Sequence, residues 1–528
     1  MDNHYPLSSW LTRQGFTSNP FASKEADFEA ASDPNRFSHS YFISDYWFSL
    51  IAGDWQQPRP ALLYGMRGSG KSATRLALEY ECRDNSLAGR VLATSYLDFE
   101  EAVRATTPEA TRQAHLTAIT RQVAIALFHF LEARPALLSQ SLSNPWYDFF
   151  AQVLASYTPL LQPFHLEKLL RANNLLGLAL SRESLDNLPS ANTRPWLELL
   201  LKAKESEPLT DHPSRSTLAG LFEVGQQVGL VAIYVLLDRV DELLETAGDP
   251  QVGAKMLTPL LADLRLLELP GYGFKFFIPG EVFQALQQNS AFRADRLQHV
   301  EIRWTQPLLK RFLTNRLRAY SHSRISSLGP LCNENLSPII DDWLVELAGL
   351  SPRNLLRLGE LLITQHISSA QADELLSRAD LENAYQVLVS QLQREGQPGG
   401  FKLDLPGELP SEPDSGPRLG EKGLRLDMAR RMVWCDGREL AHPPVGLELD
   451  LLEYLYERAG FVISKEEIIR AIYREEAMEV EDQRLAKLVQ RLRDKLEPPA
   501  SNQPEKRRTS SYIVTIPREG YKLENRVL

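Results

Sequence analysis

The chain has 528 residues, a formal net charge of −10 and three cysteines. Its length exceeds what a single compact core holds, so we expect about three folded units. The acidic balance excludes a generally basic nucleic-acid coat, and any DNA contact must come from a local basic patch. Cys82, Cys332 and Cys435 are far apart and lack C-x-x-C spacing, which indicates a reducing compartment without a disulfide framework or a zinc site.

The N-terminal residues lack the basic-then-apolar pattern of a secretory signal. No apolar run approaches the roughly 18 residues that suggest a membrane span. We therefore expect a cytoplasmic protein with no membrane partner. Residues 1–60 are rich in aromatic side chains and turn formers, as in Asn19-Pro20-Phe21, and we expect them to pack on the core of the domain that follows.

A glycine-rich loop joins an apolar strand to a helix between Ala61 and about Glu81. Its pattern is G-x-x-x-x-G-K-S, and its glycines let main-chain N–H groups surround phosphate oxygens. Lys71 supplies a charge for the β- and γ-phosphates, Ser72 supplies a hydroxyl for Mg²⁺, and the helix points its positive end at the same anion. The residues expected to contact the nucleotide are Gly65, Arg67, Gly68, Ser69, Gly70, Lys71, Ser72 and Ala73. The sequence therefore predicts that the chain binds ATP or GTP.

Residues 61–304 are predicted to form an α/β core around a parallel sheet. A second strand, Val91–Asp98, completes a β-α-β unit, and the apolar run Val231–Leu237 has the composition of a buried parallel strand. Further strands are expected at 274–278 and 299–304. Residues 105–229 are Leu- and Ala-rich with a helical period, which predicts a helical insertion, and a protein partner could bind there.

Acidic side chains follow the apolar strand 231–237. Asp238 is placed where a carboxylate can hold Mg²⁺ through water, and Asp241 or Glu242, one turn later, can orient the attacking water. The alternative is that these acidic residues only mark a solvated end of the strand. The presence of the glycine loop in the same chain makes this alternative less favoured. The sequence therefore predicts Ser72 and Asp238 as metal ligands, and Lys71 with Asp241 or Glu242 as catalytic residues.

The run Leu236-Leu-Asp-Arg-Val-Asp-Glu242 resembles the extended Walker B motif of STAND-type and NACHT-type NTPases. In most AAA+ ATPases a Glu follows the Asp directly, whereas Arg239 stands there in this chain, so the catalytic acid stays open. ATPases related to the AAA+ group often place a Pro-Phe-containing segment against the adenine. This resemblance gives residues 1–60 a second interpretation, as part of the base site.

Three further arginines, in two segments, are candidates on the same resemblance. Arg293 and Arg296 precede a strand where AAA+ proteins carry an arginine finger, which stabilises charge at the γ-phosphate of a neighbouring subunit; a surface ion pair is the alternative. The run Gly349-Leu-Ser-Pro-Arg353 resembles the lid motif of Orc/Cdc6-type AAA+ proteins and the G-x-P element of STAND proteins, with one extra residue. The resemblance implies a helical lid at 305–393, contact between Arg353 and the nucleotide, and a nucleotide-dependent homo-oligomer, although Pro352 also suits an ordinary helix start.

Residues 394–422 are rich in Gly, Pro, Glu and Ser, which predicts a flexible linker. The remaining residues, 423–528, are predicted to form a separate α+β domain with short strands, three helices and a final hairpin. The helices are expected at 447–459, 465–473 and 482–496, and the hairpin at 512–516 and 520–523. The runs Arg491-Leu-Arg-Asp-Lys-Leu496 and Ile513–Leu523 resemble the OmpR/PhoB-type winged helix, and the match extends over the whole domain.

The third of these helices is amphipathic. Its apolar side chains share one face, and we expect its basic side chains to lie together on the opposite side, where they suit a DNA major groove. These are Arg484, Lys487, Arg491 and Lys495, and Arg518 at the tip of the hairpin can reach the backbone or minor groove. Three observations argue against DNA binding by this domain. Its net charge is close to zero, acidic residues precede the third helix, and winged helices inside STAND proteins also bind proteins.

These observations predict an ATP-dependent switch that uses ATP and Mg²⁺ and couples nucleotide binding and hydrolysis to binding of double-stranded DNA. Regulation of transcription, a mobile element or antiviral defence would suit such a switch. The alternative is a STAND-like signalling scaffold with slow or no turnover, whose winged helix binds a protein partner.

Overall fold

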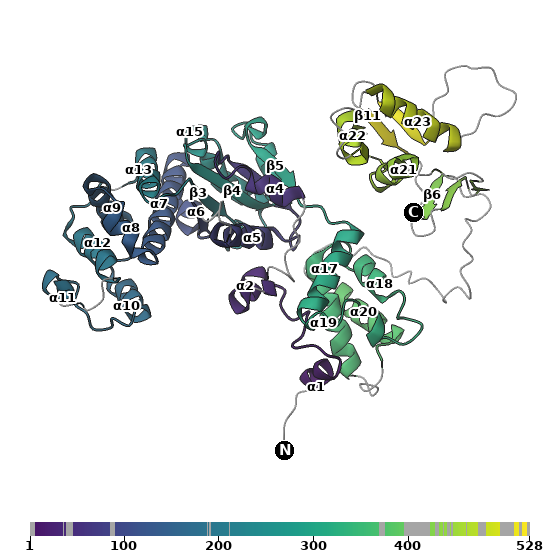
Figure 1. Cartoon of the computed structure of the whole chain (residues 1–528), viewed down its shortest axis with the longest axis horizontal. Helices are drawn as coiled ribbons and strands as arrows, with labels where there is room; N and C mark the ends of the chain where they lie inside the picture. Colours follow the sequence, from purple (N-terminus) through teal and green to yellow (C-terminus); the bar gives the residue numbers. More distant parts are fainter. Residues whose placement is uncertain are drawn as a thin grey trace. The chain divides into compact units, whose positions relative to one another are not determined.

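The computed structural model describes two compact units, Met1–Leu403 and Asp404–Leu528 (Figure 1). In the first unit the described residues are 6–34, 36–37, 46–84, 90–186, 188, 192–210, 212–368 and 375–394. In the second they are 423–427, 432–436, 438–440, 444, 447–460, 462–473, 482–496, 512–516 and 520–524. Nearly all of the predicted linker 394–422 therefore lies outside the described residues.

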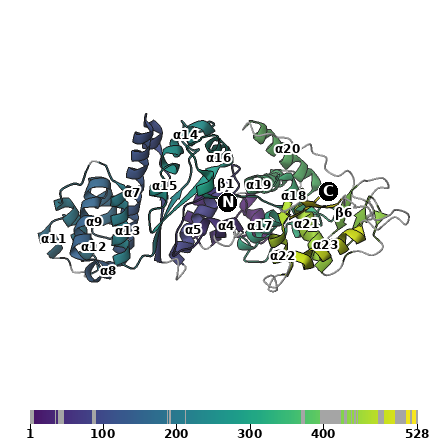
Figure 2. The same cartoon turned by 90° about the horizontal axis from the view of Figure 1, so that it is seen from above.

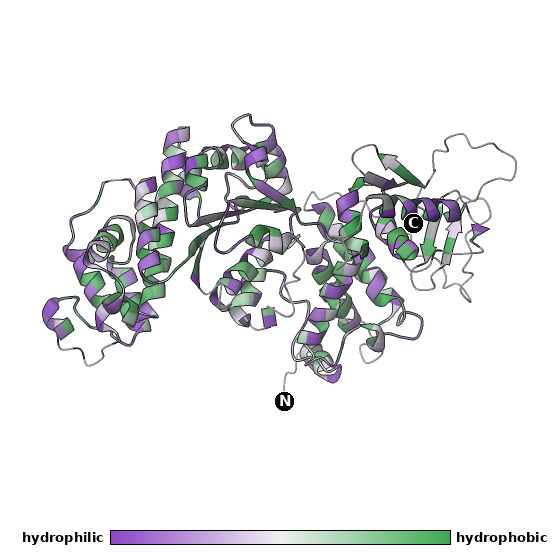
Figure 3. Ribbon diagram, turned by 45° about the horizontal axis from the view of Figure 1, so that its top comes forward, coloured by the Kyte–Doolittle hydropathy of each residue, from purple (hydrophilic) through white to green (hydrophobic). Residues whose placement is uncertain are grey.

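The first unit is built on a five-stranded parallel sheet with the order β2-β3-β4-β1-β5. The strands are β1 (Ala61–Gly65), β2 (Val91–Tyr96), β3 (Ala232–Leu237), β4 (Tyr272–Pro279) and β5 (Gln298–Glu301). Every residue of β3 and β4 is buried, and the strands of the sheet are coloured mostly as hydrophobic in Figure 3. Parallel strands covered on both faces need such continuous apolar runs. The predicted mixed α/β fold with a parallel sheet is confirmed.

The chain leaves the neighbouring strands β1 and β4 in opposite directions. From β1 it crosses to β2 at one edge of the sheet, and from β4 it crosses to β5 at the other edge. Loops that diverge from adjacent parallel strands open a crevice at the carboxyl ends of those strands, which is where ligands bind in open α/β sheets. The glycine loop follows β1 at this point.

Helices cover the sheet, and a further group of helices lies beside it. Helix α5 (Lys71–Asp84) follows the glycine loop, and α7 (Pro108–Glu132) packs on β2. Beyond α7 lies a group of helices that occupies one end of the unit (Figures 1 and 2). These are α8 (Pro135–Gln140), α9 (Asn144–Tyr157), α10 (Pro163–Ala172), α11 (Arg182–Asp186), α12 (Arg194–Glu205) and α13 (Arg215–Gln227). The helices α14 (Pro250–Leu261), α15 (Leu264–Leu267) and α16 (Gly280–Gln287) lie between the later strands.

The sequence analysis expected no segment long and apolar enough to span a membrane, and helix α7 is an exception. Among the described residues it is the one helix that meets that test of length and composition. Half of its apolar stretch is buried within the unit. It also carries the buried His115, whose ring bonds the Tyr96 hydroxyl at 2.9 Å and the Met256 carbonyl oxygen at 3.0 Å.

A helical subdomain follows the sheet. It contains α17 (Gln306–Ala319), α18 (Ile340–Leu347), α19 (Pro352–Ser368) and α20 (Arg378–Arg394). The first helix of the chain, α1 (Pro6–Arg13), packs into the same core through Trp10 and Leu11. Trp47 and Ile51 of α4 (Tyr46–Ala52) instead pack on the sheet. The N-terminal segment was expected to pack on the α/β core, and this is right for α4 and wrong for α1, because the large apolar side chains of α1 complete the helical subdomain.

The second unit contains two small antiparallel sheets and three helices. One sheet consists of β6 (Leu424–Asp427), β7 (Met432–Cys435) and β8 (Arg438–Glu439). The helices are α21 (Leu447–Glu457), α22 (Lys465–Tyr473) and α23 (Asp482–Leu496). The other sheet has the order β10-β11-β9, with β9 (Val462–Ser464), β10 (Ile513–Ile516) and β11 (Gly520–Leu523). The predicted helices and hairpin are present, and β9 is a strand that the sequence analysis did not predict.

Candidate functional site

A cavity of about 460 Å³ opens beside the glycine loop of the first unit. The end of β3, the N-terminal helix α2 (Ala26–Ser32) and the start of α19 contribute to its walls. The residues predicted from the sequence that line it are Arg67, Gly68, Ser69, Gly70, Lys71, Ser72, Ala73, Asp238, Asp241, Glu242 and Arg353. Gly65 lies just before the loop, at the end of β1.

The loop has the geometry of an anion cradle. Gly68 and Gly70 have φ values of +80° and +96°, a region that favours glycine. A Cβ on Gly68 would lie 2.8 Å from the Cβ of Arg353, whereas a Cβ on Gly70 would meet nothing within 4 Å. Helix α5 begins at Lys71 directly after the loop. The positive end of α5 therefore lies at the loop, where it favours an anion in the cavity.

Lys71 folds back over the loop. Its Nζ donates hydrogen bonds to the carbonyl oxygens of Gly65 at 3.1 Å and Met66 at 3.0 Å. Burial lowers the pKa of Lys71, and the nearby carboxylates of Asp241, Asp238 and Glu281 oppose that change. Both bonds are to neutral main-chain acceptors, so an anion in the cradle would offer the ammonium group a stronger partner.

Aromatic side chains form an apolar side of the cavity. Trp47, Trp304 and Phe312 line it, and the ring centroids of neighbouring pairs lie 5.9 Å apart. The indole Nε1 of Trp304 donates to the Ser69 carbonyl oxygen at 2.7 Å, which fixes the loop. Trp47 belongs to the N-terminal segment whose second interpretation was part of the base site, whereas the sequence analysis did not single out Trp304 or Phe312. Phe21 of the Pro-Phe segment is fully buried against Gly359 of α19 and is not among the described residues that line the cavity.

Asp238 is buried at the end of β3 with hydrogen bonds to both of its oxygens. Oδ2 accepts from Arg75 Nε at 3.0 Å, and Oδ1 accepts from the main-chain N–H of Arg239 at 2.9 Å. Arg239 has a φ of +68°, which is sterically unfavourable for a residue with a side chain. Residues held in such strained conformations cluster at functional sites. Each oxygen keeps a further lone pair, so Asp238 can also accept from a metal-bound water.

Arg75 and Asp27 are site residues that the sequence analysis missed. Arg75 lies one turn after Lys71 on α5 and is 2 % exposed. Besides Asp238, it donates to Ser95 Oγ at 3.0 Å, Glu79 Oε2 at 3.4 Å and Asp27 Oδ1 at 2.5 Å. Its spacing from Lys71 was a signal for Arg75, because residues four apart share a helix face. No local pattern points to Asp27, since it lies far from the loop in the sequence.

Arg75→Met is expected to lower the free energy of unfolding of the first unit by about 3–5 kcal/mol, because it leaves Asp238 buried without its counter-charge. Urea unfolding followed by tryptophan fluorescence measures this change. Arg83→Met is the control, since Arg83 lies on the same helix with 62 % of its side chain exposed and should change stability by less than about 0.5 kcal/mol. If the two substitutions lower the free energy of unfolding equally, the buried Arg75–Asp238 pair does not make the stabilising contribution expected of it.

The two acidic candidates after Asp238 lie in the cavity wall. Partial burial raises the pKa of Glu242, with Arg239 opposing and the neighbouring acids Asp238 and Asp241 adding to the rise. Glu242 remains 55 % exposed and lies 3.7 Å from Arg239 Nε. The geometry brings both Asp241 and Glu242 to the site and does not select between them.

The two arginine candidates differ in their placement. The side chain of Arg353 lies against Gly68, and Arg357 lines the cavity one turn further along α19. Arg296 ends the short helix η2 (Ala294–Arg296), is 61 % exposed and lies 3.9 Å from Asp295. It is not among the described residues that line this cavity, so the structure does not bring it to the chain's own site, and its role toward a neighbouring subunit stays a prediction.

The residues of the cavity fit an anion that carries a divalent cation. The described residues contain no group of three or more His, Cys, Asp or Glu side chains that could hold a metal without other ligands. Mg²⁺ commonly uses one or two carboxylates and completes its shell with phosphate oxygens and water. Asp238 and Ser72 on one side, and an anion in the glycine cradle on the other, match that division.

In the second unit, α23 anchors its apolar face in the core through Leu485, Leu488, Val489, Leu492 and Leu496. Arg484, Lys487 and Arg491 are exposed. Lys495 is half-buried, and its Nζ lies 2.8 Å from Glu448 of α21, which also lies 3.7 Å from Arg491 Nε. The expectation of a basic row opposite the core is therefore wrong for Lys495, because the row runs beside the apolar face and its end meets α21. Arg518 lies outside the described residues.

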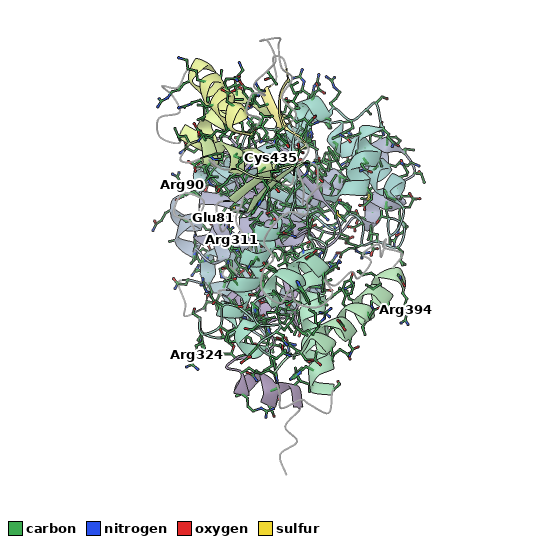
Figure 4. The ribbon with its side chains drawn as sticks, turned by 90° about the vertical axis from the view of Figure 1, so that its right-hand side faces the viewer. Glu81, Arg90, Arg311, Arg324, Arg394 and Cys435 are labelled. Atoms are coloured by element: carbon green, nitrogen blue, oxygen red, sulfur yellow. The ribbon has the colours of Figure 1, made fainter. Side chains whose placement is uncertain are left out.

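Arg493 is a structural residue of α23 that the sequence analysis did not identify. Its guanidinium donates to the carbonyl oxygen of Ile513 at 2.7 and 3.0 Å, and to Thr515 Oγ1 at 2.8 Å. These bonds hold the β10–β11 hairpin against α23. The basic side chains of α23 thus divide into exposed ones and ones that maintain the fold. Basic side chains of the first unit, such as Arg90, Arg324 and Arg394, lie at separate places on its surface (Figure 4).

Comparisons with known proteins address the second unit. A search of curated proteins finds no match to the chain. A family model described as "Transcriptional regulatory protein, C terminal" matches residues 445–523, which span α21 to β11. This family suggests DNA binding in transcription regulation. The C-terminal part of the chain is therefore an OmpR/PhoB-type winged-helix domain.

Proposed function

We propose that the chain is an ATP-dependent switch that couples nucleotide binding in the first unit to DNA binding by the winged helix. One observation carries the nucleotide assignment: the glycine loop, Lys71, Asp238 and Arg353 meet around a single cavity, although they come from distant parts of the sequence. A cradle of main-chain N–H groups, a lysine and a carboxylate is the arrangement that holds a nucleoside triphosphate with Mg²⁺.

The residues that the sequence predicted for the phosphates, the metal and the water have defined tasks in this proposal. The glycine loop and Lys71 hold the phosphates, and Ser72 and Asp238 hold Mg²⁺, which supplies charge neutralisation on the phosphate oxygens. Asp241 or Glu242 orients water. Arg353 connects the loop to α19, so that the position of the helical subdomain depends on the phosphates. A nucleotide shifts the equilibrium between two positions of the helical subdomain only if it makes different contacts in each. Arg353 is placed to make such contacts.

The DNA assignment rests on the winged-helix match and on the exposed side chains Arg484, Lys487 and Arg491. Positive side chains on a helix that enters the major groove neutralise phosphates and contact base edges. The proposal includes a nucleotide-dependent homo-oligomer in which Arg296 reaches the nucleotide of a neighbouring subunit. The exposed side chain of Arg296 motivates this part of the proposal. A cytoplasmic location suits a protein that binds DNA and ATP.

The alternative is a signalling scaffold that holds nucleotide with little turnover and binds a protein through its winged helix. Two observations favour it. Arg239 occupies the position directly after Asp238 and turns toward Glu242. Glu448 engages the end of the basic row on α23. The first observation concerns hydrolysis and the second concerns DNA, so the two can be tested separately.

Steady-state ATP hydrolysis by the full chain separates the switch from the scaffold. We expect Mg²⁺-dependent turnover that falls by about 100-fold or more in Glu242→Gln or in Asp241→Asn, whichever carries the group that orients water, while ATP binding is retained. Glu245→Gln, in the same loop and exposed, is the control and should retain wild-type turnover. Purified protein that retains nucleotide without turning it over would favour the scaffold.

A further inference from the structure

Helix α2 connects the two parts of the first unit through side chains that point to different partners. Asp27 contacts Arg75 of α5 and Arg239 after β3, whereas Glu29 contacts Arg316 of α17. Lys24, two residues before the first residue of α2, pairs with Glu360 of α19. The N-terminal segment therefore supplies a carboxylate to the cavity while it is held by the helical subdomain.

Asp27 bridges the two arginines that flank Asp238. Its Oδ1 lies 2.5 Å from Arg75 and its Oδ2 lies 2.7 Å from Arg239. Burial alone would raise the pKa of Asp27, but the two guanidinium groups outweigh it and hold the pKa below its ordinary value. Asp27 is thus a carboxylate that stays charged between two cations.

The position of Asp27 is fixed from the opposite side of α2. Glu29 is 2 % exposed, accepts a hydrogen bond from Arg316 at 3.0 Å and accepts another from the Tyr320 hydroxyl. Ala26 and Ala30 pack in one apolar cluster with Ala73 of α5. A carboxylate held by packing and by buried bonds on its own helix is preorganised for its partners.

The charge around Asp238 depends on Asp27. The guanidinium of Arg75 donates to one oxygen of Asp238, and the main-chain N–H of Arg239 donates to the other. The guanidinium of Arg239 bonds Asp27 and interacts with Asp238 only through its charge. Two guanidinium charges close to a carboxylate weaken its attraction for a divalent cation. Asp27 neutralises part of that positive charge, and the other carboxylate on Arg75, Glu79, is already shared with Arg83.

We propose that Asp27 is a positioning residue that holds Arg75 and Arg239 so that Asp238 can bind a divalent cation. The inference rests on the proposed function, since the cation accompanies a nucleotide in the glycine loop. It places one residue of the N-terminal segment at the metal side of the site, whereas the sequence analysis connected that segment with the base. Asp27 acts through the two arginines and touches neither the nucleotide nor the metal in this role.

The test is equilibrium binding of a non-hydrolysable ATP analogue to the full chain, by titration calorimetry, in excess Mg²⁺ and in EDTA. The ratio of the affinity in Mg²⁺ to the affinity in EDTA should be about fivefold or more smaller in Asp27→Asn than in the wild type. This is the effect expected when one charge that acts on a divalent ion in water-like surroundings is removed. In EDTA the variant should bind the analogue as tightly as the wild type or more tightly, because a negative charge near the phosphates is gone. Loss of a merely structural residue would instead lower the affinity in both buffers together.

Two variants serve as comparisons. Asp27→Glu keeps the charge and should restore most of the Mg²⁺ gain, and Asp33→Asn, at the end of the same helix, should behave as the wild type. Equal loss of affinity in both buffers, or a full Mg²⁺ gain in Asp27→Asn, would overturn the role of Asp27 and leave the nucleotide site standing. If wild-type protein binds the analogue in neither buffer, the proposed function and this inference both fail.

Discussion

Lys71→Ala is expected to weaken ATP binding by about 100-fold or more. The ammonium group of Lys71 bonds carbonyl oxygens of Gly65 and Met66 in this structure, so its charge has no anionic hydrogen-bond partner among the described residues. A hydrogen bond between charged groups contributes about 1.5–3 kcal/mol, and removal of Lys71 also releases the two carbonyl groups that shape the loop. Titration of the full chain with a fluorescent ATP analogue measures the change.

Lys71→Gln separates the two contributions of Lys71, since glutamine can donate a hydrogen bond and carries no charge. We expect it to weaken binding nearly as much as alanine, because the charge dominates the interaction with a triphosphate. Lys168→Ala, which removes an exposed lysine from α10 of the helical insertion, is the matched control and should bind ATP normally. ATP affinity that is equal in Lys71→Ala and in the wild type would exclude the glycine loop as the nucleotide site.

The double substitution Lys487→Ala with Arg491→Ala should weaken DNA binding by about tenfold to 100-fold at moderate salt. Both side chains are exposed on α23, the helix that enters the major groove in winged-helix proteins. Loss of two phosphate contacts should also reduce the slope of log affinity against log salt by about 2. Fluorescence anisotropy with duplex DNA of random sequence, over a series of salt concentrations, measures both quantities.

Arg438→Ala is the control for this experiment, because Arg438 is an exposed arginine of β8 and lies outside the matched residues 445–523. It should leave the salt slope unchanged. Lys495→Ala should have a smaller effect than either exposed residue, since Lys495 is paired with Glu448. A double variant that binds DNA with wild-type affinity and slope would favour the protein-binding role of the winged helix.

The strands and the winged helix could be predicted because their signals are local. The run Val231–Leu237 is apolar throughout and rich in β-branched residues, which is typical of a strand buried on both faces. The helix 482–496 shows its period in its own sequence, and its bounds are as predicted. The turn glycines of the loop and the acidic end of β3 are likewise encoded within a few residues of each other.

Contacts between distant segments could not be predicted in this way. Asp27 and Arg75 meet through the fold, and nothing near Asp27 in the sequence distinguishes it from other surface acids. Trp10 was expected on the α/β core and packs in the helical subdomain, because hydrophobic pattern alone does not say which apolar surface a segment covers.

The basic row of α23 shows the same limit at smaller scale. Helical spacing places Arg484, Lys487, Arg491 and Lys495 on one side of the helix. Whether that side faces solvent depends on the neighbouring helix, and Glu448 of α21 pairs with the last of the four. Spacing predicts which residues share a face, and packing decides how much of the face is exposed.

The affinity of the full chain for duplex DNA, measured without nucleotide, with ADP and with a slowly hydrolysed ATP analogue plus Mg²⁺, tests the coupling of the two units most directly. We expect the triphosphate and diphosphate states to differ in DNA affinity by about tenfold or more, which corresponds to a coupling free energy of about 1.4 kcal/mol. Lys71→Ala should show one DNA affinity under all three conditions. If wild-type protein binds the nucleotides and its DNA affinity is the same in every state, the chain is not a nucleotide-controlled DNA switch.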